Sequence, residues 1–310
     1  NPDFAYVHNT WFKGSLGIFR VLKKNNVETL LKIHNFRYDC TRTYFSKKHL
    51  NDKEFCNACG LKKENVGIFN KYFENSYIKS FFVNKYGIKY FQIIKKNNFK
   101  ILVLTEFHKE YLKEIGIEND RIFLFPNYVE LIDKDIHTSK EDLILYAGRI
   151  SEEKGVLELI SAFKICNFKN TKLVIIGGGP ILSHLKNKFS EEGIEFKGEQ
   201  TNSEVKQLIN KSKAVVTVTK LFEGQPTLLC EASALGVPSI YPRSGGISEF
   251  FPEEDLFSFE QFNYSDLIEK LKLTKDNNLL KDSGYKNKKF IEDKLNQKNL
   301  FKKYETILHE

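Results

Sequence analysis

The sequence predicts an α/β protein in which two doubly wound parallel sheets follow one another along the chain. Short, β-branched apolar runs alternate with helical stretches of about 10–15 residues, a rhythm typical of βαβ units. Several runs, such as AVVTV at 214–218, are apolar almost throughout, which indicates strands covered by helices on both faces. A polar segment at about 127–141 interrupts the alternation, and 310 residues is about twice the length of a typical domain.

The expected elements follow in chain order. In the first half, strands are expected at 4–8, 28–33, 100–104 and 121–125, with helices at 15–25 and 107–115. In the second half, strands are expected at 142–148, 172–177, 194–198, 214–218 and 237–241, with helices at 154–167, 180–192, 203–211 and 226–235. Residues 264–310 indicate two or three further helices. We therefore expect domains at 1–136 and 137–285, followed by a C-terminal helical segment at 286–310 that packs back toward the first domain.

Residues 36–99 depart from the alternation and are dense in aromatic side chains, with basic residues between them. One interpretation is a set of amphipathic helices that pack on the sheet. The other is a surface that docks a lipid-linked or carbohydrate acceptor at a membrane interface. The pattern alone leaves both open.

The charge balance restricts the class of partner. The chain has 48 Lys and Arg against 40 Asp and Glu, a net charge of +8. Of the basic residues, 42 are Lys and scattered, whereas proteins that read nucleic-acid bases depend on Arg. A nucleic-acid module is therefore disfavoured, and a weak affinity for an anionic membrane surface stays open.

The ends and apolar runs bear on localisation. No apolar run reaches 18 residues, so no membrane-spanning helix is expected. The chain shows no signal peptide, begins NPDFAYVH and contains no Met, which we interpret as an N-terminal truncation. The expected location is cytoplasmic, with the inner face of the plasma membrane as a peripheral site.

The five cysteines do not form the framework of a disulfide-rich protein. Cys166 and Cys230 lie in helical patterns and are expected to be buried thiols. The other three, in one polar stretch with a single C-x-x-C spacing, are Cys40, Cys56 and Cys59. Zinc would need a fourth ligand such as His34 or His49, so a reduced thiol cluster without metal is favoured.

The first charged motif, Gly148-Arg149 to Lys154-Gly155, directly follows the expected strand at 142–147. Ligands bind beyond the carboxyl ends of strands in open α/β sheets. Two cations beside a helix N-terminus suit a diphosphate. An ordinary loop at a helix start is the alternative.

The second charged motif covers residues 223–231. Glu223 stands at a turn, Gly224 and Gln225 leave amide groups free before Pro226, and Glu231 falls within the following helix. Two carboxylates around exposed N–H groups could hold sugar hydroxyls and a phosphate together. A buried helix with a capping Glu is the alternative.

Two glycine-rich turns complete the set. Gly245-Gly246 allows the backbone to approach a ligand closely, although a bare turn explains it equally well. The GGGP run at 177–180 lacks the G-x-G-x-x-G spacing of dinucleotide sites. We expect it to form a tight strand-to-helix turn with Pro180 at the helix start.

Together these motifs resemble family 4 of the retaining glycosyltransferases of the GT-B fold. The similarity rests on GRxxxxKG at 148–155, GxGP at 177–180, FEGxPxxxxEAxAxGxP at 222–238 and GGxxE at 245–249. PDFAYVHN (2–9) and LKIHNFRYDC (31–40) resemble that family's acceptor-domain strands and its His-bearing loop. The family's opening strand and glycine-rich loop are missing here, consistent with a truncation.

The resemblance implies two Rossmann-like domains that face a cleft. It also implies transfer of a sugar, with retention, from a nucleotide-diphosphate donor to a saccharide or lipid-linked acceptor in surface polysaccharide synthesis. A UDP-sugar is the favoured donor, and neither a metal nor another cofactor is expected.

The resemblance assigns a role to each site residue. A diphosphate-binding pair, a donor-sugar contact and a cleft histidine form the expected catalytic set: Arg149, Lys154, Glu223 and His34. Nucleotide binding is expected of Gly148, Gly224, Gln225, Pro226, Thr227, Leu228 and Glu231, with Glu231 on the ribose. His8 and Trp11 are expected on the acceptor side. Structural roles stay open for His34, His8 and Trp11.

Two alternative functions remain at this point. One is a nucleotide-sugar-binding protein without turnover, since the truncation removes part of the acceptor domain. The other is a different GT-B enzyme such as a UDP-sugar epimerase, for which the sequence offers no identifiable acid/base pair.

Overall fold

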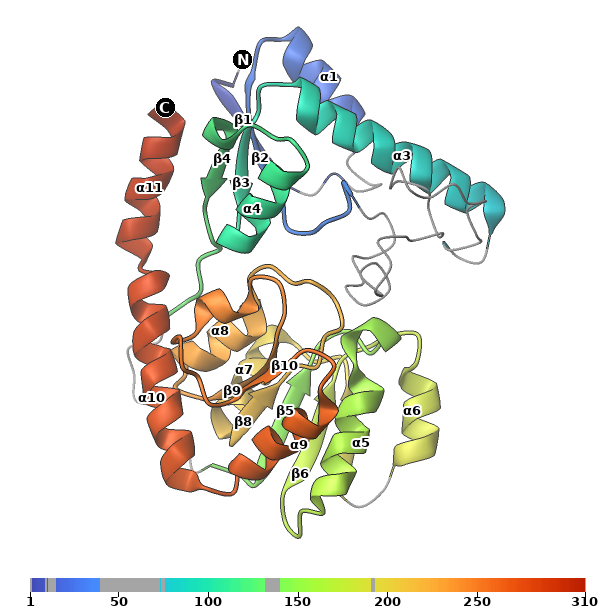
Figure 1. The fold of residues 1–310 in the computed structure, drawn as a ribbon, viewed down its shortest axis with the longest axis vertical. Coiled ribbons are helices and arrows are strands. Elements are labelled where there is room, and N and C mark those ends of the chain that lie inside the picture. The colour runs from blue at the N-terminus through green and yellow to red at the C-terminus, as the bar shows by residue number, and fades with distance from the viewer. Residues whose placement is uncertain are drawn as a thin grey trace. The chain divides into compact units, whose positions relative to one another are not determined.

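The computed structural model describes residues 2–8, 10, 15–39, 73, 76–131, 140–190 and 193–309 (Figure 1). The chain divides into two compact units, Asn1–Pro126 with Phe301–Glu310 (unit 1) and Asn127–Leu300 (unit 2). Each unit contains one parallel sheet. The boundary expected between residues 136 and 137 lies outside the described residues, and the segment expected at 286–310 begins inside a helix of unit 2.

The sheet of unit 1 has the order β1-β2-β3-β4, and all its pairings are parallel. Its strands are β1 (Phe4–His8), β2 (Glu28–Lys32), β3 (Lys100–Val103) and β4 (Ile122–Leu124). The helices of the same unit include α1 (Gly17–Lys24), α3 (Tyr77–Lys96) and α4 (Glu106–Glu114), with a 3-10 turn at Asn119–Arg121. These strands match the four expected in the first half.

Helix α3 occupies the end of the aromatic-rich stretch. Ser76 caps its N-terminus by accepting a hydrogen bond from the Lys79 amide. Its buried side includes Tyr90, which stacks on Phe19 of α1 at 6.4 Å between ring centroids. Residues 77–96 therefore pack as the amphipathic-helix interpretation predicts, while residues 40–72 lie outside the described residues.

The sheet of unit 2 has the order β10-β9-β8-β5-β6-β7, again with parallel pairings. Its strands are β5 (Leu143–Ala147), β6 (Lys172–Ile176), β7 (Ile194–Gly198), β8 (Ala214–Val216), β9 (Ser239–Arg243) and β10 (Ser258–Glu260). Read from β7, this is the doubly wound order, and the chain reverses its direction of winding between β5 and β8. The carboxyl ends of these two strands are thus the predicted place for a ligand.

The helices of unit 2 connect these strands, apart from the last two, which follow β10 (Figure 1). They are α5 (Val156–Cys166), α6 (Leu182–Phe189), α7 (Asn202–Lys211), α8 (Thr227–Ala234), α9 (Tyr264–Leu273) and α10 (Asn277–Lys294). Single 3-10 turns cover Glu152–Lys154 and Ile247–Phe250.

The structure corrects several expected boundaries in unit 2. β9 begins at Ser239, because the Val237 amide still donates to the Ala232 carbonyl and so belongs to the end of α8. Helix α6 begins at Leu182, so Pro180 lies in the preceding turn and not at the helix start. Strand β10, three residues long, was not expected, because so short a run carries no alternation.

The chain closes with α11 (Gln297–His309), the third helix of the region 264–310. Within unit 1, Ile307 is buried against Leu30 and Leu102, and the Lys100 ammonium donates to the Leu308 carbonyl at 3.2 Å. In the described part of the chain, no helix is both long enough and apolar enough to cross a bilayer.

Candidate functional site

A cavity of about 220 Å³ opens at the carboxyl ends of β5 and β8 in unit 2. Most of the residues that the sequence assigns to the site line it: Gly148, Arg149, Lys154, Glu223, Gln225, Pro226, Thr227 and Leu228. They come from two separate parts of the chain, residues 148–154 after β5 and residues 223–228 after β8, and the strand order brings these together. Gly224 and Glu231, by contrast, are not among its lining residues.

Glycine at two positions lets the loops of this site meet. Gly155 has φ +70°, and a Cβ there would lie 2.1 Å from the Val218 carbonyl oxygen. Gly245 has φ +58°, and a Cβ there would lie 2.4 Å from the Glu223 carbonyl oxygen. Any side chain at either position would push the loops apart. The first contact holds the loop after β5, with Lys154, against the segment after β8.

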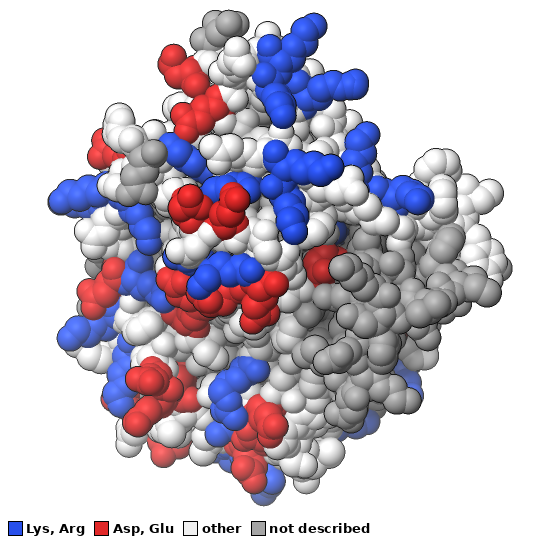
Figure 2. Space-filling model, turned by 45° about the horizontal axis from the view of Figure 1, so that its top comes forward, with Lys and Arg blue, Asp and Glu red and all other residues white. Residues whose placement is uncertain are grey.

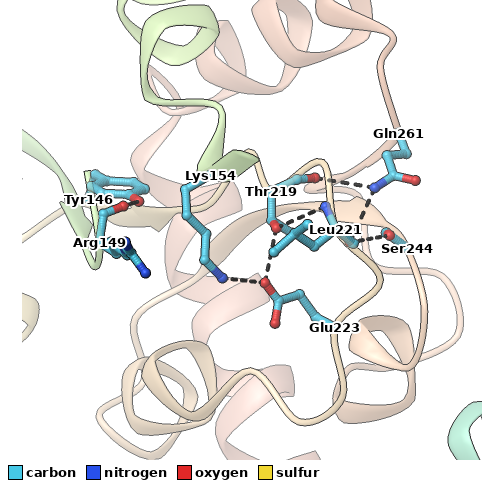
Figure 3. Close-up of polar contacts among 8 residues, drawn as sticks. All are labelled: Tyr146, Arg149, Lys154, Thr219, Leu221, Glu223, Ser244 and Gln261. Atoms are coloured by element: carbon cyan, nitrogen blue, oxygen red, sulfur yellow. Dashed lines mark hydrogen bonds and ion pairs between the residues drawn. The ribbon is translucent and has the colours of Figure 1, made fainter. Parts of the chain in front are cut away.

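The Lys154 ammonium forms an ion pair with Oε1 of Glu223 inside this cavity (Figure 3). Both side chains are 29% exposed, so the pair is half-buried. The Thr219 hydroxyl lies 3.0 Å from the same carboxylate oxygen and donates to it. Glu223 thus has one oxygen with two donors.

The segment that carries Glu223 is held by surrounding polar groups (Figure 3). Gln261 donates from Nε2 to the carbonyls of Thr219 (3.3 Å) and Leu221 (3.4 Å). The Ser244 hydroxyl donates to the same Leu221 carbonyl at 2.8 Å. The Gly246 amide donates to the Glu223 carbonyl at 2.9 Å. These contacts leave the Glu223 backbone little freedom to move.

Arg149 is the second cation at the cavity. Its side chain is exposed, and among the described residues its guanidinium makes no hydrogen bond or ion pair. Its backbone is anchored, because the Tyr146 hydroxyl donates to the Arg149 carbonyl at 2.8 Å. Burial, and then the nearby carboxylate of Glu223, raises the pKa of Tyr146 and keeps this hydroxyl protonated. The backbone of Arg149 is thus fixed, while its guanidinium is available to bind an anion.

Helix α8 directs its first amides at the cavity. Pro226 is the N-cap residue and not the first residue of the helix, and no side chain caps it. The first hydrogen bond within the helix is donated by the Cys230 amide to the Pro226 carbonyl, at 3.0 Å. The amides of Thr227, Leu228 and Leu229 therefore have no acceptor within the helix, and all three residues line the cavity.

Gln225 lines the cavity and also makes structural hydrogen bonds. Its amide nitrogen donates to the Asn127 carbonyl at 2.9 Å, and its Oε1 accepts from the Asn127 amide at 2.5 Å. The side chain is 8% exposed. It therefore ties the first residue of unit 2 to the loop before α8, a long-range contact that no local pattern could have predicted.

Glu231 lies within α8 and is half-buried. Burial raises its pKa, the charge of Lys206 lowers it, and that of Glu130 raises it. Lys206, on α7, forms an ion pair with Glu130 at 2.9 Å. Lys206 therefore favours the ionised form of a carboxylate that burial disfavours. Neither Lys206 nor Glu130 was expected at the site from the sequence.

Unit 1 carries the two histidines that the sequence singled out. His8 ends β1, and its Nδ1 lies 3.0 Å from Nε2 of His34, so that one ring donates to the other. Burial, with the charges of Lys32 and His8, lowers the pKa of His34 to about 4. Lys32 itself is buried, which lowers its pKa to about 8. Trp11 lies outside the described residues.

A third histidine was not singled out by the sequence. His108, in α4, is 1% exposed, and its Nε2 lies 2.8 Å from the Tyr38 hydroxyl. Burial lowers the pKa of His108 to about 3. It stands three and four residues before Tyr111 and Leu112, the other buried side chains of α4, and this helical spacing is the signal that could have indicated its burial.

The described residues contain no cluster of three or more His, Cys, Asp or Glu that could bind a metal. Cys166 and Cys230 are buried free thiols, as expected. Cys40, Cys56, Cys59 and His49 lie outside the described residues, so the expectation of a metal-free thiol cluster stays a prediction.

Comparison with known proteins gives one family match and several relatives. The model of the family Glycosyl transferases group 1 matches residues 129–291, more than half of the chain. N-acetyl-alpha-D-glucosaminyl L-malate synthase of Bacillus anthracis is 26% identical over 199 residues, 62% of this chain and 51% of that protein. The capsular polysaccharide biosynthesis glycosyltransferase CapM of Staphylococcus aureus is 26% identical over 226 residues, 69% of this chain and 56% of CapM. The chain thus spans about half the length of these curated relatives.

Among solved structures, Anabaena HepE in complex with UDP and glucose is similar with a TM-score of 0.72 at 12% identity. The similarity covers 98% of this chain and 77% of that one. It shows the fold, which is GT-B as predicted.

The buried histidines of unit 1 predict a stability that falls on acidification. Folded protein keeps His108 neutral down to about pH 3, whereas the unfolded chain takes up this proton near pH 6.5. Unfolded protein binds one more proton at this residue between these values, so His108 alone should lower the free energy of unfolding by roughly 1.4 kcal/mol per pH unit from pH 6.5 to about pH 3. Denaturant unfolding at a series of pH values measures this slope.

His108→Gln should reduce that slope by about 1.4 kcal/mol per pH unit, the contribution of one proton. Tyr38→Phe is the matched control, because it removes the hydrogen-bond partner and keeps the titrating ring. An unchanged slope in His108→Gln would contradict the assignment.

Proposed function

Since the chain belongs to the family Glycosyl transferases group 1, we propose that it transfers a sugar from a nucleotide-diphosphate donor to a saccharide or lipid-linked acceptor. The observation that carries this proposal is the set of positive groups at one cavity of unit 2. Arg149, Lys154 and the free amides that begin α8 all line it.

These groups match the chemistry of a departing diphosphate. Negative charge grows on the leaving group as the bond to the sugar breaks, and preorganised cations lower the barrier to that step. The amides of α8 and the positive end of its dipole add to the same field. With Arg149 and Lys154 present, we propose that the reaction needs no metal and no other cofactor.

Glu231 is the proposed ligand of the donor ribose. An ionised carboxylate can accept hydrogen bonds from both vicinal hydroxyls of a ribose. Burial raises the pKa of Glu231, and the charge of Lys206 counteracts that rise. We propose UDP as the nucleotide, a choice supported by the UDP complex of HepE. Glu223 is the proposed contact to the donor sugar.

We further propose that transfer proceeds with retention, as in glycosyltransferase family 4. Among the described residues, the cavity lining has no carboxylate besides Glu223, whereas a conventional double displacement uses two. A front-face reaction is therefore favoured, in which the departing phosphate oxygen takes the acceptor proton. His34, neutral near pH 7, is a proposed sugar contact, and His8 and Trp11 remain proposed on the acceptor side.

The acceptor class follows from the relatives and from the surface of unit 1. CapM is named for capsular polysaccharide biosynthesis, which supports a surface polysaccharide as the product. Helices α1 and α3 together carry eight Lys and Arg and no Asp or Glu, as large a charge as the net +8 of the chain. Figure 2 shows blue side chains gathered at the upper right, the part of the molecule where Figure 1 draws α1 and α3.

Apolar side chains are exposed on the same two helices: Val21 (57%), Ile78 (71%) and Phe82 (66%). Basic residues interspersed with exposed apolar ones suit the interface of an anionic bilayer. We propose a cytoplasmic protein that binds the inner face of the plasma membrane weakly through this surface.

Titration calorimetry with UDP, GDP and ADP tests the proposed donor. UDP should bind with micromolar affinity, and Arg149→Ala and Glu231→Ala should each weaken binding by about tenfold or more, because each removes a charge-assisted contact. Lys281→Ala, which removes a positive charge from α10, is the control. A folded protein that binds none of the three nucleotides would contradict the proposal, and binding without transfer would favour the alternative of a binding protein.

Sedimentation with vesicles tests the membrane surface. The protein should bind phosphatidylcholine vesicles that contain phosphatidylglycerol, less so at high salt, and not pure phosphatidylcholine. The double variant Lys85→Glu, Lys89→Glu should lower binding more than about tenfold. Lys281→Glu with Lys289→Glu on α10 is the matched control, and equal binding by both double variants would contradict the assignment.

A further inference from the structure

If the proposed function holds, the Lys154 ammonium has two possible partners, the Glu223 carboxylate and the diphosphate of the donor. Its ammonium is paired with Glu223 in the structure, whereas the proposed reaction requires it at the diphosphate. The pair is half-buried, so Glu223 without a compensating donor would be a poorly solvated carboxylate. Something other than Lys154 must then stabilise Glu223 once a diphosphate has bound.

Thr219 is placed to do this. Its side chain is 2% exposed, and its hydroxyl donates to Oε1 of Glu223 at 3.0 Å. A hydroxyl has one proton to donate, and here the Leu221 amide donates to the Thr219 oxygen at 3.2 Å. That amide occupies an acceptor position, so the proton is directed at the carboxylate.

The backbone around Thr219 is tied to the loop of Lys154. The Lys220 amide donates to the Glu153 carbonyl at 2.9 Å, beside the close contact of Gly155 with Val218. Gln261 holds the carbonyl of Thr219 from the segment after β10. Thr219 can therefore keep its position when the flexible Lys154 side chain turns away.

We infer that Lys154 exchanges the Glu223 carboxylate for the diphosphate of the incoming nucleotide, and that Thr219 is the positioning residue that holds Glu223 during this exchange. In the free protein, Glu223 neutralises Lys154 and keeps the cavity from binding other anions tightly. In the complex, Lys154 and Arg149 both face the diphosphate, and Glu223 stays in place for the sugar.

The exchange predicts that UDP affinity depends on the charge of the side chain at position 223 and not on its size. Glu223→Gln removes the competitor of the diphosphate and keeps a side chain of the same size, so UDP should bind about tenfold more tightly. Thr219→Val should weaken UDP binding several-fold, because Lys154 can then leave only an unsupported carboxylate. Thr219→Ser should restore the native affinity.

The double variant Thr219→Val, Glu223→Gln separates a positioning role from a merely structural one. If Thr219 acts through the carboxylate, the double variant should bind UDP as tightly as Glu223→Gln alone. If Thr219 only supports the fold, its loss should weaken both backgrounds equally. Thr171→Val is the matched control. The Thr171 hydroxyl donates to Asp142 at 3.3 Å, and both residues directly precede the amino ends of β6 and β5, whereas the cavity lies at the carboxyl ends.

Calorimetry with UDP and, separately, with inorganic pyrophosphate is the measurement, with circular dichroism confirming that each variant is folded. UDP or pyrophosphate affinity in Glu223→Gln that equals or falls below the native value would overturn the exchange. Native protein that binds pyrophosphate but not UDP would contradict the proposed donor, while the pyrophosphate series would still decide the exchange.

Discussion

The close approach of Gly155 to Val218, in the segment after β8, is the constraint on which the site depends. A Cβ at this position would lie 2.1 Å from the Val218 carbonyl oxygen, so only glycine allows the loop after β5 to rest on the segment after β8. This contact places Lys154 beside Glu223, although 69 residues separate them. The doubly wound order makes β5 and β8 neighbours. Backbone packing therefore comes first, and the charge arrangement follows from it.

The sequence was sufficient for the parts of the site that follow from topology. Because the carboxyl ends of parallel strands share one edge, motifs after β5 and β8 could be predicted to meet, and Arg149, Lys154 and Glu223 do line one cavity. Thr219 was missed because it directly follows the apolar run at 214–218, and a β-branched residue there looks like a continuation of the strand. The bonds of Gln225 to Asn127 and of Lys206 to Glu130 join distant segments through side chains, and no spacing rule anticipates them. The predicted start of β9 was wrong because hydrogen bonds at the end of α8 extend to Val237, so that the strand begins at Ser239.

Charge is distributed differently in the two units. In unit 2, Lys154 at the cavity pairs with Glu223, and Lys206 on α7 pairs with Glu130, whereas Arg149 has no carboxylate partner among the described residues. In unit 1, α1 and α3 have basic residues and no acidic ones. The first arrangement suits an anion that must displace an existing partner, which favours a strongly charged ligand such as a diphosphate. The second suits a diffuse anionic surface, where binding is weak and reversible. Both features support the proposal of an enzyme that binds a nucleotide-sugar donor and acts on an acceptor at a membrane.

The most direct test of this account is a crystal structure of the protein with UDP bound. The account predicts diphosphate oxygens in contact with Arg149, Lys154 and the first amides of α8, with Glu223 still hydrogen-bonded to Thr219. Lys154 should have turned from Glu223 to the diphosphate. A nucleotide bound away from this cavity, or a diphosphate bound while Lys154 keeps only its pair with Glu223, would contradict the central claim.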